Sequence, residues 1–443
     1  MAKQQHLGWF LSRGFGPQGW GRPDWDWGYD WRRPDLYQQS VRQLEQAGLD
    51  LLIIEDALSA GNPATLDLRV RTAYGAPKHD PVVLTPYLLD ATRHLGIVPT
   101  VNVGSYLPYV AARQFASLHH LSDHRVGINV VTDVGSATHL GQERLSHDAA
   151  YDRADDWVTG IRELWHSWSD GALVADPATG RYADASQIDA VRHRGSHFSF
   201  DGPLNAVPFD GADPLIVSPG GSPRGLDFAG RHSDVQLALT SLDVDSIRAY
   251  RERVRTASAA HGREDALRTL FVMKPRIVAS AEEADRVVAA SAHPGEEQLK
   301  AIALGWSSDA ETDLTVLDLD RPLDDVVFGE HVSRGTVAGL RGRYAEEPDA
   351  PLRRILAQHA RLCRVTDGTG RRGTEFVGTA EEVADLIEEL GDDAGNDGLI
   401  LSGDLHPVTV HRMLDELVPV LRRRGILRRE YGDGGVAGNL RDF

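Results

Sequence analysis

The feature that most constrains the fold is an alternation of short, almost wholly apolar segments with longer amphipathic ones. Residues 49–54 read Leu-Asp-Leu-Leu-Ile-Ile, and comparable runs recur at 7–11, 97–103, 126–132, 215–218, 235–239, 269–277 and 398–402. Helical periodicity occupies the intervening segments 35–47, 81–94, 109–121, 148–169, 222–231, 244–261, 281–291, 380–390 and 407–423. Apolar strands separated by helices are typical of a parallel sheet covered on both faces. About eight such units favour a closed α/β barrel, the (β/α)8 or TIM barrel, over an open sheet.

The chain has 443 residues, whereas one such barrel needs about 250. The additional length falls into segments 13–34, 57–80, 170–212 and 295–375 and into a C-terminal tail, 424–443. We therefore expect a single domain over 1–443 that carries long insertions. Segment 295–375 is rich in Gly, Asp and Arg, with one helical stretch near 352–362, so we expect an insertion or lid without a core of its own.

Composition excludes several classes of protein. A net charge of −18 argues against nucleic-acid binding, which needs a clustered basic face. No apolar run approaches the ~20 residues of a membrane helix, and residues 1–10 lack the pattern of a secretory signal. A single cysteine, Cys363, forms neither an internal disulfide nor a thiolate metal cluster. We expect a cytoplasmic protein that binds neither nucleic acid nor membranes.

In a parallel barrel the residues that end the strands meet at one mouth. Here they are mostly neutral hydrogen-bonding side chains, with one acid: Asp56, Thr100, Asn102, Asn129, Thr132, Ser218, Ser222 and Ser402. A hydrolase would more often show a carboxylate pair or a nucleophile with its base, and a metal enzyme would show convergent His and carboxylate ligands. His119, His120 and His124 lie at a helix end and the turn before a strand, so we expect solvated histidines there and no metal site.

Residues 218–225, Ser-Pro-Gly-Gly-Ser-Pro-Arg-Gly, follow a predicted strand and open a predicted helix. Ser222 is placed as the N-cap, with Pro223 at the first helical position. Gly220 and Gly221 let a ligand approach the backbone, and free N–H groups at a helix start attract phosphate. Helix capping alone explains the same residues, so both interpretations remain open. The spacing matches neither a Walker loop nor G-x-G-x-x-G.

His147 and Tyr151 are four residues apart at the start of a long helix, so they share one face. Such a pair can hold an anionic or ring-bearing ligand at the mouth. A surface histidine beside a partly buried tyrosine is the alternative. Asp56 can likewise serve as a turn or N-cap residue instead of a ligand contact.

Tryptophans are concentrated near the N-terminus, where five of the nine fall in the first 31 residues: Trp9, Trp20, Trp25, Trp27 and Trp31. The stretch from Trp20 onwards is interleaved with Gly, Pro and Asp, too irregularly for a helical stripe. A pocket wall and a packed loop both remain possible. We expect the early tryptophans to wall a substrate pocket, with Trp20, Trp25 and Trp27 as the candidates.

Five segments, at residues 112–132, 147–155, 220–229, 418–425 and 439–442, resemble the large component of the nitrilotriacetate, pristinamycin-synthase and dibenzothiophene-sulfone monooxygenases, within the bacterial luciferase-like superfamily. Residues 112–132 resemble that family's A-R-x-F-A-x-L-D-x-L-S-x-G-R-x-x-W-N-V-V-T, and residues 147–155 resemble its H-x-x-R-Y-x-R-A-E. Residues 220–229 resemble A-G-x-S-P-x-G-x-x-F-A, and short matches recur at 418–425 and 439–442. Asp123, His124 and Ile128 depart from the usual residues, and 14–31 and 295–375 match least.

The resemblance implies a barrel that binds FMN at its mouth. Its flavin contacts fall on Asp56, Thr100, His147 and Tyr151, and its phosphate loop on Gly221 and Ser222. Asn102 and Asn129 are candidate donors near the flavin ring, and Asn129, His147 and Tyr151 are the candidate catalytic residues. Reduced FMN from a separate NAD(P)H-dependent flavin reductase would react with dioxygen, and one oxygen atom would enter a small organic substrate, aromatic or heteroatom-containing.

Three other functions remain open from the sequence. One is a deazaflavin-dependent oxidoreductase that transfers hydride without dioxygen, another is a non-catalytic flavin-binding subunit, and the third is a metal-dependent barrel hydrolase. The resemblance favours the monooxygenase, as a homodimer or homotetramer.

Overall fold

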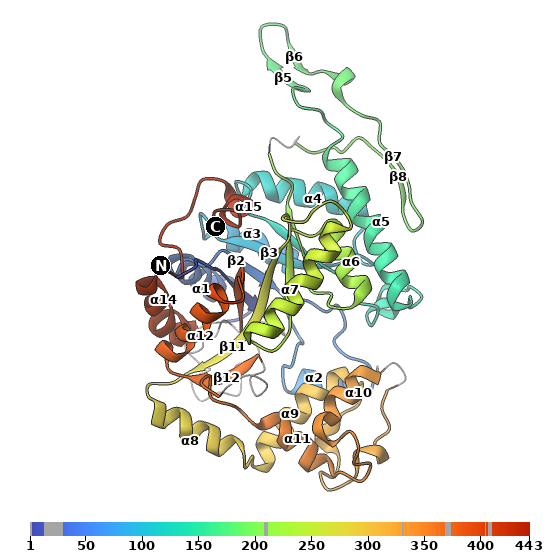
Figure 1. Ribbon diagram of the computed structural model, residues 1–443. Helices are drawn as coiled ribbons and strands as arrows, with labels where there is room; N and C mark the ends of the chain where they lie inside the picture. Colours follow the sequence, from blue (N-terminus) through green and yellow to red (C-terminus); the bar gives the residue numbers. More distant parts are fainter. Residues whose placement is uncertain are drawn as a thin grey trace.

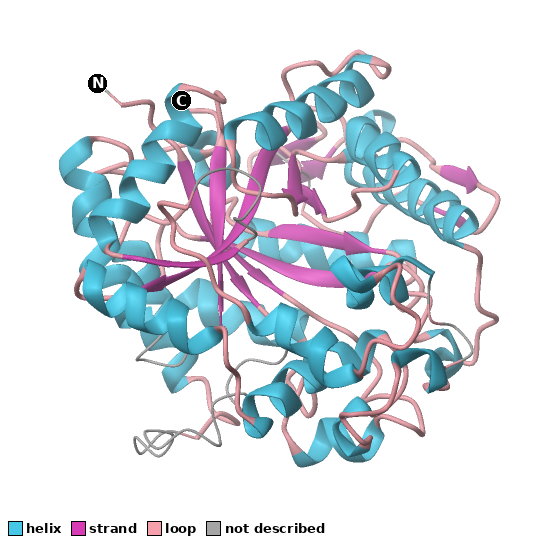
Figure 2. Ribbon diagram, turned by 60° about the horizontal axis from the view of Figure 1, so that its bottom comes forward, coloured by secondary structure: helices cyan, strands magenta, loops and turns pink. Residues whose placement is uncertain are grey.

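A computed structural model describes residues 2–12, 30–207, 211–329, 332, 334–367, 374–403, 405 and 410–443. Its centre is a closed barrel of eight parallel strands, in which β1 pairs with both β2 and β13, and β10 pairs with both β9 and β11. Helices surround the strands (Figure 2). The strands are β1 (His6–Leu11), β2 (Leu51–Ile54), β3 (Gly96–Asn102), β4 (Gly127–Val131), β9 (Leu215–Ser218), β10 (Val235–Ala238), β11 (Arg268–Ile277) and β13 (Gly398–Gly403). The predicted (β/α)8 barrel is confirmed.

Alternate residues of each strand supply two separate apolar layers. Leu51 and Ile53 of β2 pack inside the barrel, whereas Leu52 and Ile54 pack outward against the helices. Both faces of the sheet are therefore buried, which is why the strands are apolar throughout rather than alternating.

Several of the helices begin at residues whose side chains cap them. Ser146 and Ser222 accept hydrogen bonds from Ala149 N and Gly225 N, and Thr379 forms a reciprocal capping box with Glu382. The helices around the barrel are α1 (Asp35–Gln46), α3 (Pro81–Asp90), α4 (Pro108–Leu121), α5 (His147–Trp165), α6 (Pro223–His232), α7 (Val244–Ala259), α8 (Ala281–Ser291), α12 (Ala380–Asp392) and α14 (Val418–Arg424), the last preceded by a π-helical turn (Arg412–Leu417). Among the described helices none is long and apolar enough to span a membrane.

The C-terminal tail closes the end of the barrel where the strands begin. Its short helix α15 (Gly435–Asn439) places Val436 among the inward-facing strand residues. A Cβ on Gly96 would overlap the Val436 side chain, so only glycine fits there. In the same tail, the Arg428 guanidinium lies 2.8 Å from the fully buried Asp50 carboxylate.

Two β-hairpins form an arm beyond α5, which is visible at the top of Figure 1. The first joins β5 (Leu173–Asp176) to β6 (Arg181–Ala183), and the second joins β7 (Arg192–Arg194) to β8 (Ser199–Asp201). His193 of β7 fastens the second hairpin to α5, with Nε2 2.6 Å from Asp156 and Nδ1 2.9 Å from Glu163. Asp156 also accepts the backbone N–H groups of His197 and Phe198.

Segment 295–375 has its own core, so the expectation of an insertion without one was wrong. The helices α9 (Glu296–Asp309), α10 (Arg334–Arg341) and α11 (Leu352–Ala360) surround a cluster that includes Leu314, Leu323 and Ile355. These helices lie together at the bottom of Figure 1. The predicted helical stretch near 352–362 corresponds to α11, but the sequence analysis did not recognise α9 and α10 or the turns that complete the core. The segment leads into an additional strand, β12 (Glu375–Gly378), which pairs with the end of β11.

Candidate functional site

A pocket of about 590 Å³ lies at the mouth of the barrel, where β2, β4 and β9 end. It is lined by Asp56, residues 130–135, Arg144, Tyr151 and residues 218–220. These include several of the side chains that the sequence predicted at the strand ends. A second hollow, between α7 and the start of β11, lies at the opposite end of the strands and is lined by both arginines and carboxylates.

Helices α5 and α6 bring three of the predicted residues together beside this pocket. The ring of His147 lies 5.1 Å from that of Tyr151, and His147 Nε2 lies 3.2 Å from Ser222 Oγ. Ser222 Oγ also accepts the Gly225 N–H at 3.0 Å, so the capping role is confirmed. Within the described part of the chain no acceptor takes the N–H groups of Gly221 or Ser222, which leaves them available to an anion. We call His147, Tyr151, Gly221 and Ser222 the anion cradle.

The close fit of Tyr151 against the loop defines the cradle's shape. A Cβ on Gly220 would overlap the Tyr151 hydroxyl, and a Cβ on Gly225 would lie 2.8 Å from it. Burial raises the pKa of Tyr151, against the opposing effects of Thr132 and Arg224, so the phenol stays protonated at neutral pH and can donate a hydrogen bond.

Gln236 supports the same loop and was missed by the sequence analysis. Its amide donates to Gly220 O at 3.0 Å and to the Tyr250 hydroxyl at 3.2 Å, and its carbonyl accepts from Ser218. The signal for it was present, because Gln236 is the one polar residue in the apolar run Val-Gln-Leu-Ala of β10.

Thr100 and Asn129 are register partners on β3 and β4 and face each other within the barrel. Asn129 Nδ2 donates to Thr100 Oγ1 at 2.8 Å, whereas the buried Asn129 Oδ1 has no hydrogen-bond partner among the described residues. A buried acceptor without a partner is costly unless a ligand or water satisfies it. Asn102 differs, because its amide already donates to Asp133 O and accepts the Gly104 N–H. Its predicted flavin contact stays a prediction.

Asp56 and Glu55 form an acidic pair, and the sequence analysis did not predict the cation between them, Lys78. Lys78 Nζ lies 3.2 Å from Glu55 Oε2 and 3.5 Å from Asp56 Oδ1, and its side chain is 8% exposed. Burial raises the pKa of Asp56 to about 6, with the Lys78 ammonium opposing the shift. Lys78 belongs to segment 57–80, and its spacing from Asp56 carries no recognisable signal. Only the return of that segment to the mouth brings the two together.

The tryptophan prediction is wrong for Trp9 and stays a prediction for its three named candidates. Trp20, Trp25 and Trp27 lie outside the described residues. Trp9 is fully buried on β1, in the layer between the strands and the helices, so it does not line a pocket. The carbonyl of Trp31 accepts from the Tyr37 hydroxyl at 2.8 Å.

One of the three histidines at the end of α4 differs from expectation, whereas His120 and His124 are partly exposed. His119 is buried rather than solvated, its Nε2 lies 2.8 Å from Ala212 O, and burial lowers its pKa to about 4. Over the described ranges no group of three or more His, Cys, Asp or Glu side chains is arranged to hold a metal ion.

Comparisons with known proteins identify the family of this chain. The model of the luciferase-like monooxygenases matches residues 8–397. The dibenzothiophene-sulfone monooxygenase of Rhodococcus erythropolis (strain XP) is 30% identical over 97% of this chain and 94% of its own length. Nitrilotriacetate monooxygenase component A of Aminobacter aminovorans is 29% identical over the same shares of the two chains.

Solved structures share the whole fold. A riboflavin lyase, determined with modified FMN and riboflavin, has a TM-score of 0.79 at 27% identity and covers 99% of this chain and 96% of its own. A long-chain alkane monooxygenase at 23% identity has a TM-score of 0.80, with the same coverage. The chain therefore belongs to the luciferase-like monooxygenases, a family of flavin-dependent enzymes.

Proposed function

We propose that this chain uses reduced FMN and dioxygen to insert one oxygen atom into a small organic substrate. The observation that carries the proposal is the anion cradle beside the mouth pocket, built by α5 and α6 from His147, Tyr151 and Ser222. A helix start with unused N–H groups suits the phosphate of FMN, because it binds an anion without a lysine.

The residues at the mouth suit the rest of a flavin. The unpartnered Asn129 Oδ1 can accept a hydrogen bond from the ring system, with Thr100 fixing the amide's orientation. Asp56 borders the same pocket. Reduced FMN would supply the electrons that activate dioxygen, while the chain positions the ring and excludes water.

The geometry divides the candidate catalytic residues into two groups. His147 and Tyr151 are joined to the helix start of α6, so their place favours phosphate binding over proton transfer to substrate. Asn129 lies inside the barrel, where its buried Oδ1 has no hydrogen-bond partner among the described residues and can accept one from a ligand. We keep Asn129 as the catalytic candidate and assign the other two to cofactor binding.

A separate NAD(P)H-dependent reductase would supply the reduced flavin. The nitrilotriacetate relative is named component A, and relatives in Streptomyces pristinaespiralis are named subunits A and B of one synthase. Relatives named for dibenzothiophene sulfone, N-acetyl-S-(2-succino)cysteine and dimethyl sulfide all act on sulfur compounds. We propose an aromatic or heteroatom-containing substrate and a homodimeric or homotetrameric enzyme.

The test is dioxygen uptake with chemically reduced FMN, using a screen of sulfur- and nitrogen-containing aromatics. Uptake coupled to an oxygenated product supports the proposal. Hydride transfer from a reduced deazaflavin without uptake would instead identify the alternative oxidoreductase, and FMN binding without turnover on any compound would identify a flavin-binding subunit.

The cradle is tested by combining Ser222→Ala with Gly221→Val. We expect weaker FMN binding with the fold retained, and unchanged affinity would refute the assignment. Ser280→Ala is the matched control, because Ser280 caps α8 through the Glu283 N–H in the same way and lies outside the cradle.

A further inference from the structure

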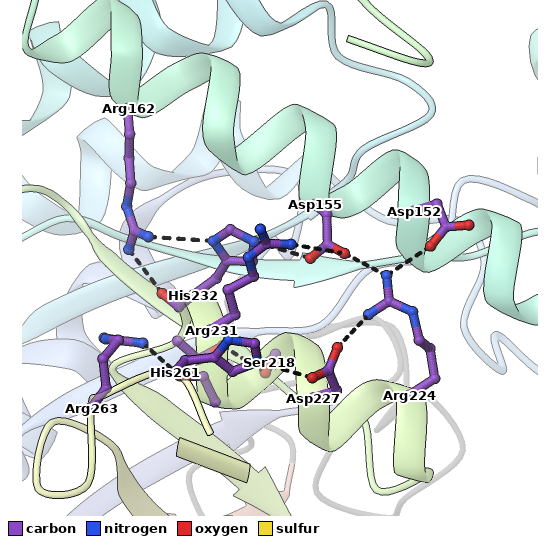
Figure 3. A network of polar contacts seen from close by, with 12 residues as sticks. Asp152, Asp155, Arg162, Ser218, Arg224, Asp227, Arg231, His232, His261 and Arg263 are labelled. Carbon is purple, nitrogen blue, oxygen red and sulfur yellow. Dashed lines mark hydrogen bonds and ion pairs between the residues drawn. The ribbon is translucent and has the colours of Figure 1, made fainter. Parts of the chain in front are cut away.

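A network of ion pairs joins α5 to α6 (Figure 3). The Arg224 guanidinium donates to Asp152 Oδ1 at 2.9 Å, to Asp155 Oδ2, and to Asp227 Oδ2 at 3.2 Å. The Arg224 side chain is only 19% exposed and that of Asp155 16%, so water screens these contacts less than it would on an open surface. Arg224 therefore ties the first turn of α6 to α5.

Asp155 holds the other end of α6 as well. Its second oxygen, Oδ1, lies 3.0 Å from His232 Nε2, and Arg162 of α5 donates to His232 O at 2.8 Å. Burial opposes the ionisation of Asp155, but the hydrogen bonds from His232 and Arg224 hold its pKa below the ordinary value. One carboxylate of α5 thus contacts both the first and the last turn of α6.

The network lies within one helical turn of each half of the cradle. Asp155 follows Tyr151 by four residues on the same face of α5, and Arg224 follows Ser222 by two residues at the start of α6. The Arg224 guanidinium is 5.6 Å from the centre of the Tyr151 ring. A shift of α6 along α5 would therefore change the 3.2 Å separation of Ser222 and His147 directly.

Charge gives Arg224 a second role. Asp152, Asp155 and Asp227 surround a single guanidinium, and without it their negative charge would face any anion in the cradle. A lysine would keep one positive charge, but its single ammonium cannot present the planar set of donors that contacts three carboxylates. Substitutions at Arg224 can therefore separate the effect of the position of α6 from the effect of the positive charge.

We propose that Arg224 and Asp155 are positioning residues for the phosphate of FMN: they set α6 against α5 so that Ser222, His147 and Tyr151 converge on it. This inference rests on the proposed function. It explains the cradle's preference for a phosphorylated flavin by two residues that do not touch the ligand.

The experiment titrates wild-type protein and variants with FMN and with riboflavin, which lacks the phosphate, and follows flavin fluorescence. For Arg224→Gln we expect FMN affinity to fall roughly three- to thirty-fold, the upper part of the range for charges at helix ends, because Arg224 is largely buried, while riboflavin affinity stays within about twofold of the wild type. Arg224→Lys should lose less, because it restores charge without the geometry. Asp155→Asn should lose FMN affinity while keeping the positive charge of Arg224.

Arg231→Gln is the matched control, since Arg231 is also on α6 and lies 3.9 Å from Asp155 but is 54% exposed. It should leave both affinities unchanged. Equal loss of FMN and riboflavin binding in Arg224→Gln and Asp155→Asn would show a general structural role and overturn the inference, as would an unchanged FMN preference. If the wild type binds FMN no better than riboflavin, the proposed cofactor fails and the inference fails with it. A variant that unfolds is replaced by Arg224→Lys, whose loss must still be specific to FMN.

Discussion

Gly220 offers a sharp test of how the loop and Tyr151 fit together. A Cβ at Gly220 would overlap the Tyr151 hydroxyl and lie 3.0 Å from Gly225 Cα, so Gly220→Ala forces either the ring or the loop to move. The ring cannot swing freely, because Phe228 lies 5.8 Å from it and Arg224 lies over its face. Overpacking of this kind costs about 1–3 kcal/mol. We expect the free energy of unfolding, measured in urea without flavin, to fall by that amount.

Gly221→Ala is the matched control in the same loop. Its Cβ would lie 3.4 Å from the Tyr250 hydroxyl, an ordinary contact, and neither glycine adopts a left-handed backbone. The change in unfolding free energy should therefore be near zero or stabilising by up to ~1 kcal/mol.

Removing the Tyr151 hydroxyl, which the Cβ of Gly220→Ala would overlap, should relieve the strain. In a double-mutant cycle we expect Tyr151→Phe to recover about 1 kcal/mol or more when combined with Gly220→Ala. Additive effects of the two substitutions, or equal stability of the Gly220→Ala and Gly221→Ala proteins, would refute the proposed fit.

Three further predictions concern buried charges. Because the pKa of Asp56 is raised from 3.8 to about 6, the folded state loses stability as pH rises from 4 to 6, by at most about 3 kcal/mol, and Asp56→Asn should remove that loss in urea unfolding at each pH. Burial opposes the charging of His193, but its carboxylate partners Glu163 and Asp156 raise its pKa. The contact between the arm and α5 is therefore strongest below pH 6.5 and weakens as the pH rises through the raised pKa. The wild type should resist proteolysis of the arm better than His193→Gln at pH 6, and the difference should shrink at pH 9. Arg428→Met should cost about 3–5 kcal/mol in unfolding free energy, because it leaves Asp50 buried without its guanidinium.

Each of these predictions has its own control or contrary result. Identical pH dependence of wild type and Asp56→Asn between pH 4 and 6 would show that Asp56 does not titrate there. A proteolysis difference that persists at pH 9 would exclude loss of the His193 charge as its cause. Arg424→Met is the control for Arg428, since Arg424 pairs with exposed carboxylates on α12 and should cost about 1 kcal/mol or less.

Several parts of the site were recognisable before any tertiary structure. The spacing of His147 and Tyr151 and the string around Ser222 are local patterns, and local backbone geometry places their side chains. His147 and Ser222 meet because each begins a helix that follows a strand end, and in a parallel barrel all such ends converge.

Other parts depend on contacts between segments far apart in the chain. Lys78 reaches Asp56 only because segment 57–80 folds back over the mouth, and Arg224 meets Asp155 across 69 residues. Nothing in the spacing of either pair predicts the contact, because each depends on how two helices or loops pack. The core of segment 295–375 was missed for the same reason, since it forms only where α9, α10 and α11 pack against one another and against the turns between them.

The sequence by itself determined the barrel, its strands, the helix starts and the candidate anion-binding residues, because these follow from hydrophobic period and capping chemistry over a few neighbouring residues. Only the tertiary structure decided that the tail closes the barrel, that Trp9 is buried in the core, and that ion pairs set α6 against α5. Those outcomes depend on which surfaces come into contact once the eight strands form the closed barrel. A local sequence pattern does not specify which distant residues it will contact.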